Sequence, residues 1–102
     1  MSESVGEEKD RLEALLELAS AAALEVRVLS AAARAAEQAP SGSATCRVGH
    51  RIWVVLSPED PVSHQSRVLA EALARHRAEF LEGRFLTPAL REFIERVDPA
   101  ER

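Results

Sequence analysis

The chain has 102 residues, 46% of them apolar, which predicts one small domain with a core of its own. Its formal net charge of −4 argues against nucleic acid as a partner, because phosphate binding needs a basic face. No apolar run approaches the length of a membrane span and the acidic start is not a signal peptide, so we expect a cytoplasmic protein without membrane contact.

The N-terminal part of the chain is predicted to be a helix followed by a strand. We expect residues 1–7 to be disordered and a helix to begin at Glu8, because Leu and Ala recur on one face from there. Residues 24–30 (LEVRVLS) alternate valines with charged residues, as a half-buried strand does. A heptad pattern through Ala36 also allows one long helix over residues 8–38. We favour the strand, since alanine at most heptad positions makes a poor coiled-coil seam.

The middle of the chain is predicted to hold a helix and a β-hairpin. Residues 30–38 are rich in alanine and should be helical, with Ser30 as N-cap. After a loop, strands are expected at 44–48 and 51–56, joined by a two-residue turn at Gly49 and His50. The apolar run of the second strand is typical of a central strand that is covered on both faces. Cys46 lies in the first strand and is interpreted as a buried free thiol.

Two helices are predicted after the hairpin. Ser57 with Asp60 resembles a capping box, and Asp60 followed by Pro61 is a second helix start. The helix then covers residues 61–76, and its continuation to residue 82, before Gly83, is left open. Its predicted buried stripe consists of Val62, Val68, Leu69, Ala72 and Leu73. The last helix is expected to start at Thr87 and Pro88, with a core face of Leu90, Phe93, Ile94 and Val97.

Together these elements predict an α+β fold with an N-terminal helix, a small sheet of about three strands that includes a hairpin, and two C-terminal helices. Residues 8–97 should form the single domain, and residues 98–102 a frayed tail.

The stretch LAEALARH (69–76) invites comparison with the HExxH helix of zinc proteases. That motif needs two histidines, four residues apart, with a glutamate between them. Around Glu71 the two ligand positions hold Ala70 and Ala74. His64 and His76 lie about 18 Å apart along a helix, too far to share an ion. The sequence therefore predicts no metal.

Other catalytic patterns have simpler explanations. Ser57, Asp60 and His64 are the residue types of a hydrolase triad, but helix capping accounts for the first two. Cys46 and His50 likewise make a weak case for a thiol pair. No glycine-rich phosphate loop is present, so we expect no cofactor and no catalytic residues.

Two parts of the sequence resemble known groups of proteins. The segment CRVGHRIWVVLSPEDPVSHQSRVLAEALARH, followed by FLTPALREFIE, resembles small bacterial proteins of similar length whose function is not established. Residues 12–77 resemble a stripped core of the ImmA/IrrE-type zincins, in which an apolar hairpin strand leads into the HExxH helix. That resemblance implies a related α+β core. It does not imply peptidase activity, because Ala70 and Ala74 replace the metal ligands.

We therefore expect a non-catalytic domain that acts through protein–protein contact, either with a partner protein or as a homodimer. The predicted interface is the helix face, with an exposed edge of the sheet as the alternative; its candidate residues are Leu12, Leu15, Leu16 and Val26. The rival hypothesis is a small enzyme or ligand-binding protein with a pocket near Glu71. Its candidate pocket residues are Glu71, His64, His76 and Arg91.

Overall fold

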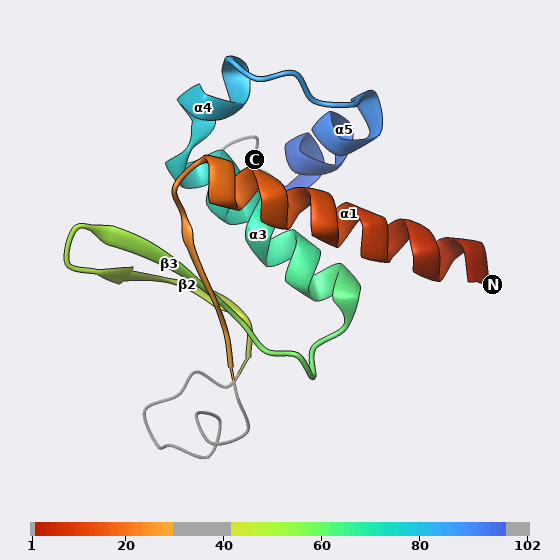
Figure 1. The fold of residues 1–102 in the computed structure, drawn as a ribbon, viewed down its shortest axis with the longest axis horizontal. Helices are drawn as coiled ribbons and strands as arrows, with labels where there is room; N and C mark the ends of the chain where they lie inside the picture. Colours follow the sequence, from red (N-terminus) through yellow and green to blue (C-terminus); the bar gives the residue numbers. More distant parts are fainter. Residues whose placement is uncertain (1, 30–41, 98–102) are drawn as a thin grey trace.

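The computed structural model describes residues 2–29 and 42–97, which form an α+β fold of helices packed on a three-stranded sheet (Figure 1). The elements are α1 (Ser2–Ala21), β1 (Glu25–Val28), β2 (Ala44–Val48), β3 (Arg51–Leu56), α3 (Val62–His76), α4 (Ala78–Glu82) and α5 (Pro88–Val97). The predicted fold class is confirmed. The helix predicted at residues 30–38 and the tail at 98–102 lie outside the described residues.

Helix α1 begins at Ser2, earlier than the predicted start at Glu8, and it ends in a Schellman motif. Ala23 adopts a positive φ of 63°, and the Leu24 N–H donates to the carbonyl oxygen of Ala19 at 2.9 Å. Leu24 and Ala19 are both buried, which supplies the apolar contact that accompanies this motif. The motif stops the helix, so the predicted strand is confirmed and the single long helix is wrong.

The sheet has the order β1-β3-β2, with β1 parallel and β2 antiparallel to the central strand β3. The bounds of β2 and β3 match the prediction. Gly49 supplies the positive φ of 64° that the tight turn between them needs. The side chains of Ile52, Val54 and Leu56 point from β3 into the core, while Val55, on the opposite face, is also buried.

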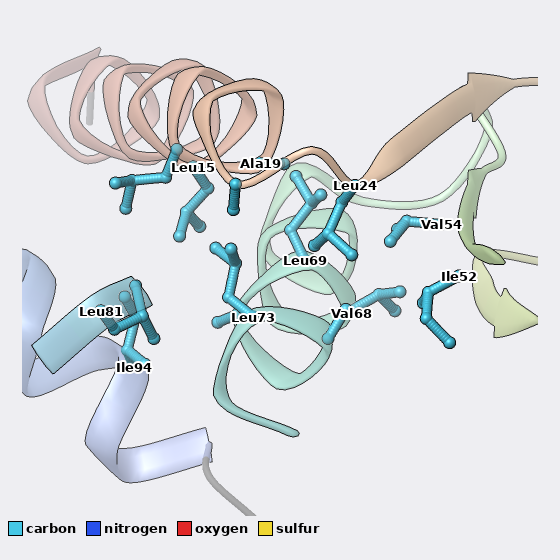
Figure 2. Packing of buried hydrophobic residues seen from close by; sticks show 14 of the residues in the cluster. Leu15, Ala19, Leu24, Ile52, Val54, Val68, Leu69, Leu73, Leu81 and Ile94 are labelled. Atoms are coloured by element: carbon cyan, nitrogen blue, oxygen red, sulfur yellow. The ribbon is translucent and has the colours of Figure 1, made fainter. Parts of the chain in front are cut away.

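Helix α3 is the centre of the core, because α1, α5 and the sheet all pack against it (Figure 2). Leu15 of α1 meets Leu69 and Leu73 of α3, and all three side chains are fully buried. The predicted stripe of α3 is largely confirmed, although Val62 is only half-buried and the stripe also includes Ala70 and Ser66.

The helical stretch after residue 61 is interrupted once, at Arg77, before it ends at Gly83. The Arg77 Nε donates to the carbonyl oxygen of Ala22 at 2.7 Å, and its Nη1 donates to that of His76 at 2.8 Å. The interruption thus places a guanidinium against the C-terminal end of α1, where backbone carbonyls lack helical partners.

The predicted start of α5 is confirmed. Pro88 is its first residue, and the Leu90 N–H donates to Thr87 Oγ1 at 3.4 Å. Its predicted core face is confirmed in the same way, with Ile94 buried and the other apolar side chains partly buried against the core. Across the described residues, no helix combines the length and apolar character that a membrane span requires.

The predicted caps of α3 are wrong. No side chain caps this helix, and the residue before it is Pro61. The Asp60 carboxylate instead accepts the N–H of Ser43 at 2.8 Å, and the Ser57 N–H donates to Ser43 Oγ at 2.9 Å. Both residues therefore hold Ser43, just before β2. For the Asp60 carboxylate, this distant partner replaces the local cap.

Candidate functional site

A groove of about 320 Å³ lies between α3 and β2. It is lined by Ser43, Ala44, Thr45, His64, Val68, Glu71, Ala72, Arg75 and His76. The residues from α3 recur every three or four positions and therefore form one side of the helix. Val68 and Ala72 are buried, whereas the other helix residues of the groove are half-buried or exposed and polar. The groove thus has a small apolar floor between polar walls.

One end of the groove is built around Asp60. Its carboxylate accepts the N–H of Ser43 and lies 3.9 Å from Nε2 of His64. The hydrogen bond from the Ser43 backbone is the main cause that lowers the pKa of Asp60, and the nearby charge of His64 adds to it. Asp60 is thus an ionised anchor that joins the start of β2 to the start of α3.

The other end of the groove is lined by Arg75 and His76. Arg47 of β2 does not line the groove, but it lies near enough for its charge to act on His76. Burial is the first cause that lowers the pKa of His76, and the positive charges of Arg47, Arg75 and Arg77 lower it further. The imidazole is therefore neutral at pH 7. Within the described part of the chain, neither Arg47 nor Arg75 forms an ion pair.

The side of β2 that faces α3 is set by its register. Thr45 pairs with Val54 and Arg47 pairs with Ile52, and paired residues point to the same face of a sheet. Val54 and Ile52 belong to the core below the helices, so Thr45 and Arg47 also point to the helical side. Both are exposed because β2 is at the edge of the sheet.

Three of the four predicted pocket residues share this groove. His64 and His76 lie at its two ends and the half-buried Glu71 lies between them. Arg91 does not belong to it. Arg91 is on α5, where it lines a separate hollow with Leu86, Ile94 and other residues.

The predicted interface residues lie in the domain's own core instead of on a free helix face. Leu15 is fully buried, and Leu12, Leu16 and Val26 pack partly buried against the same cluster. The leucine face of α1 is used by α3, whereas the alternative, an edge of the sheet, is open in the part of the chain that the structure describes.

The triad-like residues do not form a catalytic arrangement. Ser57 is buried, and within the described part of the chain no hydrogen bond joins it to His64. At 3.9 Å, the distance between His64 and Asp60 is too long for a hydrogen bond. Cys46, predicted to be buried, is a half-buried free thiol, and His50 is exposed in the turn. In residues 2–29 and 42–97, the His, Cys, Asp and Glu side chains form no group of three or more that could hold a metal ion.

Four further residues at or beside the groove were not predicted as site residues: Ser43, Thr45, Arg47 and Arg75. Thr45 and Arg47 alternate along a strand whose bounds were predicted, so this alternation was a usable signal. No comparable signal existed for Ser43, because its partner Asp60 is 17 residues away in the sequence.

Comparison of the chain with protein-family models, with curated proteins and with solved structures finds no match. The resemblance to the zincin core and to the small bacterial proteins therefore stays a prediction.

Proposed function

We propose that this domain is a non-catalytic protein-interaction module that captures an extended segment of a partner in the groove between α3 and β2. The observation that carries the proposal is the position of this groove beside the free edge of β2. An edge strand next to a helix is suited to peptide binding by strand addition. Main-chain hydrogen bonds then supply affinity, and alternate side chains enter the neighbouring groove.

The free edge has a definite hydrogen-bonding pattern. The two-residue turn makes Val48 and Arg51 a hydrogen-bonded pair, and such pairs alternate along an antiparallel ladder. Thr45 and Arg47 therefore direct their N–H and C=O groups away from β3. In the described residues, no backbone hydrogen bond outside the sheet ladder involves either of them.

The dimensions of the edge and the groove agree. The five residues of β2 span about 17 Å, and the stretch of α3 from His64 to His76 spans about 18 Å. An added strand of similar length would place every second side chain over the floor formed by Val68 and Ala72.

Two proline variants provide a matched test. A proline at Thr45 removes an outward N–H without removing a bond to β3. On the opposite edge of the sheet, the Leu29 N–H donates to Leu56 at 2.9 Å, so the N–H of Val28 points outward from β1 in the same way. Val28→Pro is therefore the control for the general effect of an edge proline.

The experiment selects binders from a displayed library of random peptides and measures their affinity by fluorescence anisotropy. We expect Thr45→Pro to weaken binding by about tenfold, the effect of one or two lost hydrogen bonds, and Val28→Pro to leave it unchanged. Glu71→Trp, which fills the groove from the helix side, should also weaken binding and does not depend on how β2 tolerates proline. Selected peptides whose affinity is insensitive to both changes, or a library without binders, would contradict the proposal.

A further inference from the structure

We infer that the captured segment is acidic and that its carboxylate binds at the end of the groove lined by Arg75 and His76, beside Arg47 on the helical side of β2. These three residues are here called the basic end. This inference rests on the proposed function, because it names the chemistry of the segment that the groove takes up.

The three groups of the basic end come together from two elements. Arg47 reaches the helical side of the sheet from β2, while Arg75 and His76 belong to the last turn of α3. The two arginines lie near enough to His76 that, after burial, their positive charges help to lower its pKa. Like charges that gather in this way repel one another, so an anion placed between them would relieve the repulsion.

The arginines of the basic end differ from those on the other face of the sheet. There, Arg27 and Arg51 share the carboxylate of Glu25, at distances of 2.9 and 2.6 Å. Arg47 and Arg75 have no such partner in the described part of the chain, and Glu71, one turn before Arg75, forms no ion pair with it. Among residues 2–29 and 42–97, these two guanidiniums are thus open to an external carboxylate.

The guanidinium favours carboxylates over other partners. It presents its N–H donors as a planar fork that matches the two oxygens of a carboxylate, and the pair is both charged and directional. A segment paired with β2 would carry side chains toward the groove at every second position. An apolar residue over Val68 and Ala72, and an Asp or Glu two positions away beside Arg47, would satisfy both parts of the groove.

A second copy of the chain fits this site less well than another protein. A second copy offers two sheet edges. The β1 edge carries Glu25, whose carboxylate is already shared by Arg27 and Arg51. The β2 edge, with the sequence ATCRV, contains an arginine and no acidic residue. Pairing two β2 edges would bring more positive charge into the same region. The charge of the basic end therefore favours a different protein with an acidic segment.

The experiment uses the peptides selected above and adds three variants. We expect the selected peptides to be enriched in Asp or Glu at one position that is two residues from an apolar one. Arg47→Gln and Arg75→Gln should each weaken binding about fivefold to tenfold, whereas Arg91→Gln, on α5 outside the groove, should not. Raising the ionic strength from about 0.05 to 0.5 M should weaken peptide binding by the wild type. The difference in affinity between the wild type and each of Arg47→Gln and Arg75→Gln should therefore become small.

A double-mutant cycle separates a direct contact from a change in folding. Once the acidic residue of a peptide is replaced by Gln, Arg47→Gln should no longer affect its binding if the two groups touch. Two results would overturn this inference and leave the proposed function standing. In the first, peptides whose binding is weakened by Thr45→Pro lack acidic residues. In the second, their affinity is unchanged by both Arg47→Gln and Arg75→Gln. A library without any binder that depends on Thr45 would overturn both.

Discussion

Ala23 shows how a single backbone conformation ends the first helix. It is the one non-glycine residue with a positive φ in the described part of the chain, and this conformation costs an L-residue about 1 kcal/mol. Ala23→Gly should remove the strain but also increase the freedom of the unfolded chain. We expect the free energy of unfolding to rise by up to about 1 kcal/mol, measured by urea denaturation.

Gly49 tests the same backbone strain by the reverse substitution, from glycine to alanine. Its φ is 64°, and a Cβ placed there would meet no atom within 4 Å, so Gly49→Ala adds backbone strain without a clash. This variant should lower the free energy of unfolding by about 1 kcal/mol. If Ala23→Gly also lowered it, the strain assigned to Ala23 would be contradicted.

His76 makes stability depend on pH. Because its pKa lies below the ordinary value of 6.5 in the folded state, the unfolded chain binds a proton more readily. The contribution of the neutral His76 to the free energy of unfolding is therefore fully present above about pH 6.5. It is lost as the pH falls toward the pKa of His76 in the folded state. We expect His76→Gln to make the decline of the unfolding free energy between about pH 7 and pH 5.5 shallower.

A proton NMR titration of His76 checks the same prediction directly. Its midpoint should lie below that of an unfolded control peptide, and Arg47→Gln should move it upward without restoring it fully, because burial is the larger cause. A midpoint at or above the ordinary value would show that the folded state does not disfavour the charged imidazole. The lowered pKa of Asp60 acts in the same direction but at lower pH, below its ordinary value of 3.8.

At the scale of elements, the contact between α1 and α3 carries much of the core. Leu15 is fully buried and Leu16 is half-buried, although the two are neighbours in the sequence. Leu15→Ala should lower the free energy of unfolding by about 2–4 kcal/mol, and Leu16→Ala by clearly less. Leu15→Glu should unfold the domain, because it buries a charge without a partner. Chemical denaturation of the four single variants, with Glu as well as Ala at both positions, measures this order.

The same four variants also test what the leucine face is for. If the face packs only within the chain, Leu16→Glu should leave the mass measured by sedimentation unchanged, whatever it does to stability. A wild-type dimer that Leu16→Glu converts into a folded monomer would restore α1 as an interface. Equal effects at Leu15 and Leu16 would contradict the packing described above.

At the scale of the whole molecule, the groove exists because two segments that are separated in the sequence, β2 and α3, meet. Ser43 before β2 is held by Asp60 in the loop before α3, and this link aligns the start of the strand with the start of the helix. Arg77 ties the opposite end of α3 to the C-terminal end of α1. A hydrogen bond between residues far apart in the sequence therefore fixes one end of the groove, and a second one holds the other end of α3 against α1.

The sequence by itself determined the elements with local causes. The strands of the hairpin were predicted with their bounds because an apolar run and a glycine turn define them, and α5 because Thr87 and Pro88 start it. The end of α1 had no glycine to mark it, because Ala23 holds the positive-φ position after the helix, and the strand that follows was recognised only from the alternation of its residues.

Only the tertiary structure decided which partner each surface meets. The periodicity of α1 indicated a buried face, but burial by α3 and burial by a second copy produce the same sequence pattern. In the same way, Asp60 was a good local cap, and a hydrogen bond to Ser43, 17 residues away, took its carboxylate instead. Hydrophobic burial is non-directional, so a sequence pattern does not say which surface covers a given face. Hydrogen bonds between distant segments produce no periodic pattern in the sequence. The groove beside Glu71 could therefore be recognised only from the packing of α3 beside β2.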